Sequence, residues 1–197
     1  MKKTPSLFVR DYHGSRQLLN KVVPGSAWVV NGEGTATRKY DGTCCLVEGG
    51  RLFKRYDAKH GKTPPAEFIP AQPEADPVTG HWPGWVPVLE TDPASRWHRE
   101  AWRDCPGLAD GTYELIGPKV QGGKESDLHG GRHVLVRHGA HPLPDAPRDF
   151  EGLRAYLEAH PDWEGIVWHH PDDRKVKVTH KGFTVTGAQP AVRSPVP

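Results

Sequence analysis

The residue types best suited to covalent chemistry lie in one short segment, Arg38-Lys39-Tyr40-Asp41-Gly42-Thr43. Lys39 ends a predicted strand, and Asp41 and Gly42 then form a tight turn into the next strand. This geometry presents a primary amine at the rim of a sheet, beside backbone N–H groups that can meet a phosphate. The pattern Lys-x-Asp-Gly is short and common, so taken alone it favours a hairpin with an exposed lysine.

Carboxylates and further cations follow in strand-like segments. Glu114 is the one acidic residue in an apolar strand at residues 111–117, and Glu164 opens the apolar run at residues 163–168. Lys175 and Lys177 are two residues apart, which places them on the same face of a strand. Taken singly, each is typical of a charged strand edge or a solvated face, and only their order along the chain indicates chemistry.

Short strands must position these residues, because Gly and Pro interrupt almost every apolar run and the runs are rich in Val, Ile, Thr and Trp. Gly49-Gly50 predicts a tight hairpin between two of the strands. The predicted strands are residues 26–31, 35–40, 43–48, 51–56, 85–89, 112–117, 133–137, 164–168, 174–179 and 183–185.

Two helices and two long loops complete the predicted elements. Asp92-Pro93 provides an N-cap for a helix that runs through Arg103, and Phe150, Leu153 and Leu157 have helical spacing before a proline. Residues 60–84 and 117–132 are long and rich in Pro or Gly, which is typical of connectors or of functional loops. The fold class that follows is α+β, with antiparallel sheets and few helices.

Length and composition exclude several classes. The 197 residues suit one domain, with room for a small appendage, and 26 basic against 24 acidic residues give a net charge of only +2. No apolar run is long enough to cross a membrane, and the N-terminus lacks the apolar core of a signal peptide. The three cysteines include no Cys-x-x-Cys pair, and no His or Cys set has zinc-finger spacing. We therefore expect a cytoplasmic protein whose cysteines are mainly small core residues.

The order of the motifs along the chain indicates more about function than any single motif does. Lys-x-Asp-Gly, a glutamate in an apolar strand, Glu-Gly-Ile-Val and Lys-x-Lys follow one another at residues 39–42, 114, 164–167 and 175–177. In this order the sequence resembles the covalent nucleotidyltransferase superfamily, the ATP-dependent ligases and capping guanylyltransferases, whose motifs I, III, IV and V these are. Thr-Arg-Lys-Tyr-Asp-Gly-Thr-Cys-Cys and Glu-Gly-Ile-Val-Trp-His-His look most like the compact stand-alone 5′–3′ RNA ligases.

The resemblance implies an α+β nucleotidyltransferase domain (an ATP-grasp-like ligase adenylation domain) over residues 1–187, with a flexible tail at residues 188–197. It also implies that the Lys39 amine attacks ATP and forms a lysyl–AMP, which passes AMP to an RNA 5′-phosphate before sealing to a 3′-hydroxyl. Glu164 would hold Mg²⁺ or Mn²⁺. The remaining nucleotide-binding residues implied are Arg55, Glu114, Glu164, Lys175 and Lys177.

The sequence departs from the family pattern at three places. Cys44 stands where DNA ligases usually carry an arginine, so Arg55 or Lys54 must supply that cation. The strand expected to stack an aromatic on adenine offers only His133 or His138. The chain also leaves no room after Lys-x-Lys for the C-terminal oligonucleotide-binding domain of DNA ligases, which argues against a DNA ligase or a capping enzyme.

Other functions stay open at this point. A degenerate nucleotidyltransferase domain could bind nucleotide or RNA without ligating, and the same core could cap RNA or transfer AMP to protein. Neither the RNA that is sealed nor the oligomeric state follows from the sequence. Basic residues interleaved with aromatics are the candidate RNA contacts, although most tryptophans are expected in the core: Lys62, Lys119, Lys124, Arg132, Arg137, Trp82, Trp85, Trp97 and Trp102.

Overall fold

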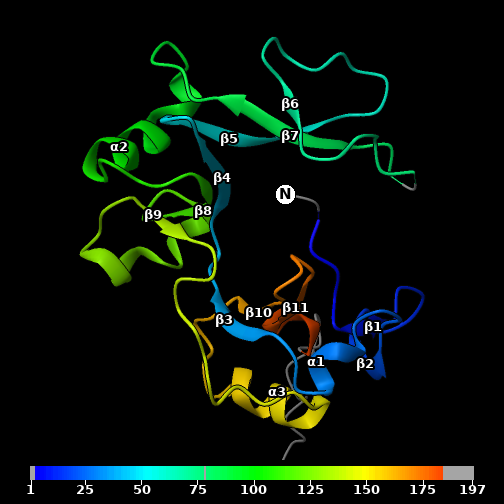
Figure 1. Ribbon diagram of the computed structural model, residues 1–197. Helices are drawn as coiled ribbons and strands as arrows, with labels where there is room; N and C mark the ends of the chain where they lie inside the picture. Colours follow the sequence, from blue (N-terminus) through cyan, green and yellow to red (C-terminus); the bar gives the residue numbers. More distant parts are fainter. Residues whose placement is uncertain (1–2, 78, 184–197) are drawn as a thin grey trace, which may run out of the picture. The chain divides into compact units, whose positions relative to one another are not determined.

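The computed structural model describes residues 3–77 and 79–183 as a mixed α/β chain with mostly antiparallel sheets and few helices (Figure 1). The chain divides into two compact units, which are described one at a time. The first unit contains Thr37–Leu143 together with the N-terminal residues up to Thr4, and the second contains Pro5–Ala36 and the chain from Pro144 onward. The expectation of one domain over residues 1–187 stays a prediction, and the tail at residues 188–197 lies outside the described residues.

A six-stranded antiparallel sheet forms the first unit. The order of its strands is β6-β7-β5-β4-β8-β9, so β5 and β4 lie at its centre. Gly49 and Gly50 both have positive φ and close the β4–β5 hairpin, in which Glu48 pairs with Arg51. The bounds are β4 (Thr43–Glu48), β5 (Arg51–Ala58), β6 (Ile69–Pro70), β7 (Trp82–Pro87), β8 (Gly111–Ile116) and β9 (Val134–Arg137).

One helix packs on this sheet. α2 (Arg96–Asp104) follows a 3₁₀ turn at Pro93–Ser95, and the Asp92 carboxylate caps that turn by accepting from the Ala94 N–H at 3.0 Å. α2 lies against β9 (Figure 1). The core beneath it gathers alternate strand residues and one face of the helix: Cys45, Val47, Leu52, Ala101, Tyr113, Leu115, Val120 and Leu135.

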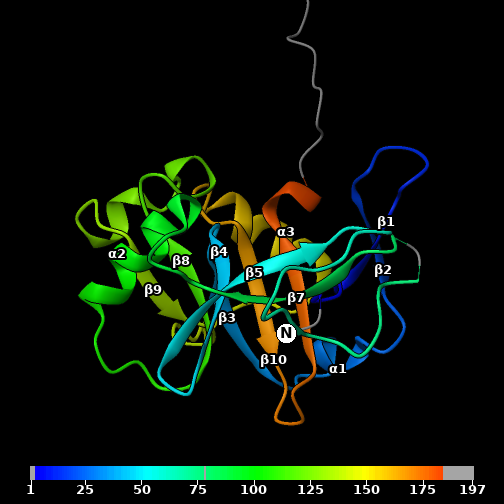
Figure 2. The same ribbon diagram turned by 90° about the horizontal axis from the view of Figure 1, so that it is seen from above.

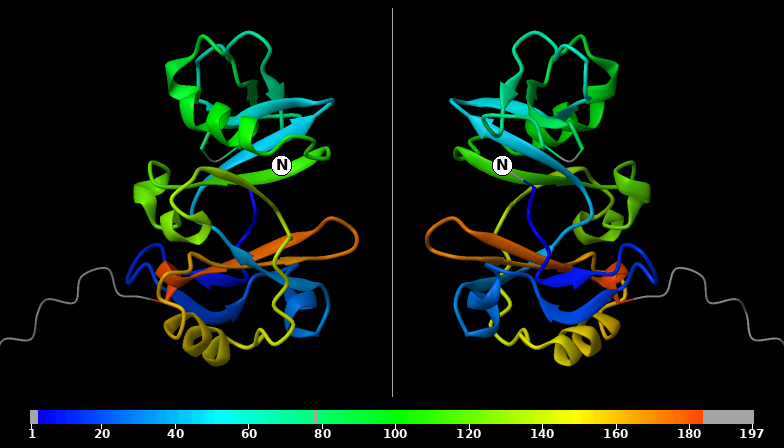
Figure 3. Two further views of the ribbon diagram at one scale, coloured as in Figure 1. Left: turned by 90° about the vertical axis from the view of Figure 1, so that its left-hand side faces the viewer. Right: turned by 90° about the vertical axis from the view of Figure 1, so that its right-hand side faces the viewer.

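Two antiparallel strand pairs and two helices form most of the second unit. β1 and β2 run side by side (Figure 2), and β10 and β11 form the orange hairpin of Figure 3. The Asp149 side chain caps α3 by accepting from the Gly152 N–H at 2.8 Å. The bounds are β1 (Phe8–Arg10), β2 (Leu18–Val22), α1 (Ala27–Val30), α3 (Phe150–Glu158), β10 (Gly165–His169) and β11 (Lys175–Thr179).

β3 (Thr35–Lys39) contains the point at which the chain passes from the second unit to the first, since Ala36 belongs to one and Thr37 to the other. The three-stranded sheet has the order β11-β10-β3. Among the described residues, no helix has both the length and the apolar character that crossing a membrane requires.

The structure corrects the sequence predictions at a few elements. The segment predicted as a strand at residues 26–31 is the short helix α1, because an apolar run this short fits either element and the buried Trp28 and Val29 decide it. Phe183 lies in a turn after the 3₁₀ segment His180–Gly182, and the rest of the strand predicted at 183–185 is outside the described residues. The sequence pattern did not predict β1, β2 and β6, which are only two to five residues long.

Candidate active site

Two faces of the six-stranded sheet carry different residues. Cys44 pairs with Glu114, and the neighbouring Cys45 pairs with Tyr113, so the two pairs project from opposite faces. Cys45 and Tyr113 belong to the buried core. Cys44 and Glu114 are only half-buried. We call the face of Cys45 and Tyr113 the core face. We call the opposite face the charged face; it carries Cys44, Arg55, Glu114 and His138.

Lys39 ends β3 and lies one short turn before the charged face. It is half-buried, and its Nζ donates to the Tyr40 carbonyl oxygen at 3.5 Å. The turn requires glycine at position 42, because a Cβ there would come within 2.3 Å of the Leu115 carbonyl oxygen and 2.7 Å of the Glu114 Cγ. The Asp-Gly turn after β3 therefore packs directly against the Glu114 side chain and the Leu115 backbone.

Three of the predicted site residues influence the pKa of one thiol, that of Cys44. Burial raises the pKa of the Cys44 thiol to about 12, and the Glu114 carboxylate contributes to the rise. Arg55 and Lys39 act in the opposite direction and lower the same pKa. The pKa of this thiol is therefore influenced by the predicted nucleophile, a cation and a carboxylate, and all of these residues belong to the first unit.

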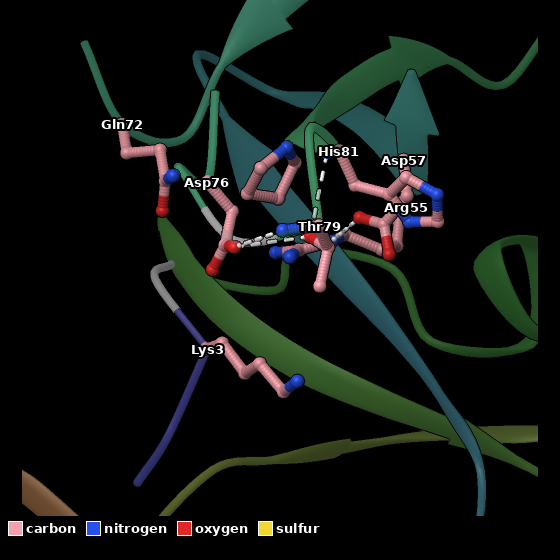
Figure 4. Close-up of a pocket in the computed structure, with 8 residues that line it drawn as sticks. Lys3, Arg55, Asp57, Gln72, Asp76, Thr79 and His81 are labelled. Atoms are coloured by element: carbon pink, nitrogen blue, oxygen red, sulfur yellow. Dashed lines mark hydrogen bonds and ion pairs between the residues drawn. The ribbon is translucent and has the colours of Figure 1, made fainter. Parts of the chain in front are cut away.

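The structure distinguishes the two cations that could replace the missing arginine. Lys54 pairs with Cys45 on the core face, and its Nζ lies 2.5 Å from the Asp92 carboxylate, whose pKa this hydrogen bond holds well below its usual range. Arg55, the next residue, projects from the charged face. Its guanidinium contacts Asp57 at 2.9 Å and lines a pocket of about 220 Å³ (Figure 4). The other pocket residues are Lys3, Gln72, Asp76, Thr79, His81 and Pro83.

The two histidines proposed as adenine platforms occupy different environments. His133 is only 4% exposed and stacks on Trp97, with ring centroids 4.5 Å apart, and its Nδ1 lies 2.8 Å from the Glu100 carboxylate. His138 lies on the charged face, where its Nε2 is 2.8 Å from the Glu114 carboxylate. Of the two, only His138 stands beside the other site residues.

A buried carboxylate from a loop holds the lysine-bearing turn. The Glu125 side chain is 1% exposed, pairs with the Arg38 guanidinium at 2.8 Å and accepts from the Asp41 N–H at 3.1 Å. Lys124 binds the Asp41 carboxylate at 2.8 Å. Glu125 thus fixes the residue before Lys39 and one shortly after it. Sequence analysis marked this loop at residues 117–132 as long, but nothing in the sequence singled out Glu125.

The candidate RNA contacts divide between surface and core. Trp85 is 3% exposed, and Trp97 and Trp102 pack against the core, as the composition argument expected for most tryptophans. Trp82 is half-buried and donates from its indole nitrogen to the Gln72 carbonyl oxygen at 2.8 Å. Lys119 and Arg132 are exposed.

The second unit carries the remaining predicted residues. Lys175 and Lys177 project from one face of β11, while Val176 and Val178 between and beyond them are buried on the other. The Lys177 backbone is fixed by the N-terminal segment, because its N–H donates to the Pro5 carbonyl oxygen at 2.9 Å and its carbonyl accepts from the Leu7 N–H at 2.8 Å.

Glu164 immediately precedes β10, and its half-buried side chain is followed by a glycine that the fold requires. A Cβ at Gly165 would stand 2.1 Å from the Val178 carbonyl oxygen. The two glycines that follow predicted site residues, at positions 42 and 165, therefore have the same physical cause, which is the close approach of a neighbouring strand.

The structure thus places Lys39, Arg55 and Glu114 in the first unit, where all three influence the pKa of Cys44, and Lys175 with Lys177 on one strand of the second. The sequence pattern predicts no role for Glu125 or Arg38, and its prediction that Cys44 is a core residue is wrong. Cys44 is half-buried on the charged face, as Cys105 is half-buried at the end of α2, and only Cys45 is fully in the core. Strand parity separates Cys44 from Cys45, but it does not say which of the two faces the core.

Comparison with known proteins relates the chain to RNA ligases. It is 29% identical to mouse RNA ligase 1, with 73% of this chain and 64% of the relative covered. It is 28% identical to the zebrafish (Danio rerio) RNA ligase 1, with 73% of this chain and 65% of the relative covered. The chain therefore spans slightly less than two thirds of the length of these relatives. No protein-family model matches it.

Proposed function

We propose that this chain is an ATP-dependent RNA ligase built on a nucleotidyltransferase domain, in which Lys39 is the covalent nucleophile. One observation carries the proposal: the turn after Lys39 packs at Gly42 against the Glu114 side chain, and Glu114 shares with Arg55 the face of the sheet on which Cys44 lies. The similarity to proteins named RNA ligase 1 supports RNA as the substrate.

The first chemical step follows from these groups. The neutral Lys39 Nζ attacks the α-phosphorus of ATP, an N–P bond forms, the P–O bond to pyrophosphate breaks, and the amine proton passes to solvent. Arg55 stabilises the charge that develops on the phosphoryl oxygens, and Glu114 accepts hydrogen bonds from the ribose hydroxyls.

The second and third steps transfer the stored activation. An RNA 5′-phosphate oxygen attacks the phosphorus of the lysyl–AMP, so the N–P bond breaks and the Lys39 amine is released. A 3′-hydroxyl then attacks the RNA phosphate and AMP leaves. We assign to Lys175 and Lys177 of the second unit the neutralisation of phosphate charge, a role that suits two parallel ammonium groups on one strand face.

A divalent cation, Mg²⁺ or Mn²⁺, fits the donor chemistry of Glu164. Its carboxylate supplies the hard oxygen ligand that such cations prefer, and its side chain is half-buried rather than sealed in the core. When bound, the ion supplies electrostatic stabilisation of the phosphate groups. Glu164 and Glu114 then have separate tasks, one toward the metal and one toward the ribose.

The test is covalent labelling with ATP that carries radioactive phosphorus at the α-position, in the presence of Mg²⁺ or Mn²⁺. We expect a protein-bound label that Lys39→Ala abolishes and that Lys59→Ala, a matched change of an exposed lysine after β5, leaves intact. Absence of label with every metal would instead indicate a nucleotide- or RNA-binding domain. Labelling by GTP in place of ATP would indicate a capping-type enzyme, and sealing of 5′-phosphorylated RNA compared with DNA tests the substrate.

A further inference from the structure

Three side chains with metal-ligating atoms meet on the charged face of the first unit. Cys44 on β4 pairs with Glu114 on β8, and Glu114 pairs with Val136 on β9. His138 follows Val136 by two residues, so all three side chains project from the same face of three neighbouring strands. The Cys44 Sγ, a Glu114 carboxylate oxygen and a His138 ring nitrogen all lie within 4.8 Å of one another, and all three residues are half-buried.

The types of ligand select the class of metal. Thiolate and imidazole favour zinc and similar borderline cations, whereas magnesium and calcium prefer sites made of oxygen atoms. Around a tetrahedral zinc ion the ligand atoms stand roughly 3–4 Å apart. The present spacing therefore needs only small side-chain rotations, chiefly a lengthening of the 2.8 Å contact between the Glu114 carboxylate and the His138 Nε2.

A second contact orients the histidine for this task. The His138 Nδ1 lies 2.9 Å from the Thr112 hydroxyl, which is also on β8. The 2.8 Å contact between Nε2 and the Glu114 carboxylate holds a shared proton, and a cation can take the place of that proton while Nδ1–H donates to the Thr112 hydroxyl. Metal-binding histidines in proteins are held by an outer hydrogen bond of this kind. Cys45, the adjacent thiol, faces the core and cannot join the site.

We propose that Cys44, Glu114 and His138 form a binding site for one thiophilic divalent cation, with zinc as the preferred metal. On binding, the cation replaces the proton shared by Glu114 and His138, and that proton passes to solvent together with the thiol proton of Cys44 as the metal–ligand bonds form. Three protein ligands leave the fourth tetrahedral position open to water or to another small donor. The site does not depend on the proposed function, although under that function a bound cation competes with nucleotide for Glu114.

Cobalt(II) titration of the full chain tests the site, because cobalt substitutes for zinc and absorbs visible light. We expect one saturable site per chain, a thiolate-to-cobalt charge-transfer band, and loss of both signals when zinc is added. Cys44→Ser should abolish the charge-transfer band. His138→Gln and Thr112→Ala should each weaken cobalt affinity by at least about tenfold. Cys105→Ser, which changes another half-buried cysteine, should alter neither signal.

Several results would overturn the proposal. They are the absence of saturable cobalt binding, a charge-transfer band that survives Cys44→Ser, and a band that is lost in Cys105→Ser. Thermal melting of each variant without metal checks that it folds, and Thr112→Ala keeps all three ligands in place. Labelling with ATP takes no part in these measurements, so failure of the metal site and failure of the ligase proposal are separately visible.

Discussion

The core face and the charged face of the six-stranded sheet are built from alternate residues of the same strands, yet they differ in what they do. On the core face, Cys45, Tyr113 and Leu115 are at most 2% exposed and pack beneath α2. On the charged face, Cys44, Glu114 and Arg55 keep part of their surface open. Adjacent residues in the sequence thus lie in the core on one side of the sheet and, under the proposed function, at the nucleotide site on the other.

The second unit repeats this division in a single strand. In β11, Val176 and Val178 are buried, while Lys175 and Lys177 are half-buried on the opposite face. The comparison teaches that period-two alternation separates the two kinds of residue without any special local structure. It also predicts that substitutions on the two faces will affect different measurements, stability for one face and lysyl–AMP formation for the other.

Glu125 is an exception to the division between stability and lysyl–AMP formation, because it is a buried residue that contacts the lysine-bearing turn. Glu125→Gln removes the negative charge that pairs with the Arg38 guanidinium, which is 12% exposed, and removing one charge of a buried ion pair typically costs about 3–5 kcal/mol. We expect a loss of that size in chemical denaturation, together with reduced lysyl–AMP formation. Glu67→Gln is the control, since its pair with Arg51 is exposed and should be worth less than about 1 kcal/mol.

Neighbouring residues of β8 provide the most direct comparison of the two faces. Leu115→Ala removes a core side chain that is 1% exposed and should lower the free energy of unfolding by about 3 kcal/mol. Glu114→Gln should change unfolding by less than about 1 kcal/mol but slow lysyl–AMP formation by about 10- to 100-fold, the value of a hydrogen bond to a charged group. Equal effects of the two substitutions on both measurements would contradict the division of the faces.

His98, a buried titratable residue, makes the stability of the first unit depend on pH. Burial lowers the pKa of His98 to about 4, and neither of its ring nitrogens has a hydrogen-bond partner. The unfolded chain therefore binds this proton at higher pH than the folded chain, so stability falls as pH drops from about 6.5 to about 4. The shift corresponds to about 3 kcal/mol.

The measurement for His98 is the pH dependence of thermal or denaturant unfolding. His98→Asn, which cannot titrate in this range, should show a shallower decrease between pH 6.5 and 4 than the original chain. Curves of the same slope for the two proteins would mean that His98 does not contribute to acid sensitivity. Other titrating groups act equally in both proteins, so the difference between the curves isolates this residue.

In the second unit, the contrast is between Lys177 and Val178. Lys177→Ala should reduce lysyl–AMP formation by about 100-fold, as expected for loss of a charge that stabilises the phosphoryl group, while costing about 1 kcal/mol of stability or less. Val178→Ala should do the reverse, since it creates a cavity at a residue only 1% exposed. Lys181→Ala, on the exposed turn after β11, serves as the matched lysine control. Parallel loss of activity and melting temperature in Lys177→Ala would make that residue structural.

The smallest expected effect concerns the two adjacent cysteines. Cys45→Ser places a hydroxyl in the fully buried core and should cost about 1–3 kcal/mol, because that hydroxyl loses its hydrogen bonds with water. Cys44→Ser lies on the charged face and should cost less than about 1 kcal/mol. Denaturant unfolding of the two single variants provides the measurement, and the reverse order would show that the faces have been assigned wrongly.

Much of the fold follows from short-range patterns. The β4–β5 hairpin follows from Gly49-Gly50 between two runs of strand-forming residues, and α3 follows from the spacing of Phe150, Leu153 and Leu157. The four-residue helix α1 does not, because Trp-Val-Val is compatible with either a strand or a helix and its burial decides the outcome. The mixed α/β character with mostly antiparallel sheets agrees with the predicted class.

The candidate site was predictable only in part. Motif order identified Lys39, Glu114, Glu164, Lys175 and Lys177, and their assignment to nucleotide and metal stays a prediction. The choice of Arg55 over Lys54 required the register of β4 against β5, which places Lys54 opposite Cys45 on the core face. The role of Glu125 could not be predicted from the sequence, because it depends on the conformation of a Gly-rich loop whose sequence has no periodicity.

The amino-acid sequence alone indicates which side chains can take part in a reaction and how they alternate along each strand, because side-chain direction within a strand depends only on local backbone geometry. Tertiary structure alone decided which strands are neighbours, and therefore that Cys44, Glu114 and His138 meet on one face while His133 stacks beneath α2. The physical reason is that strand pairing joins residues far apart in the chain, and its register is set by the burial of one whole face rather than by any single segment.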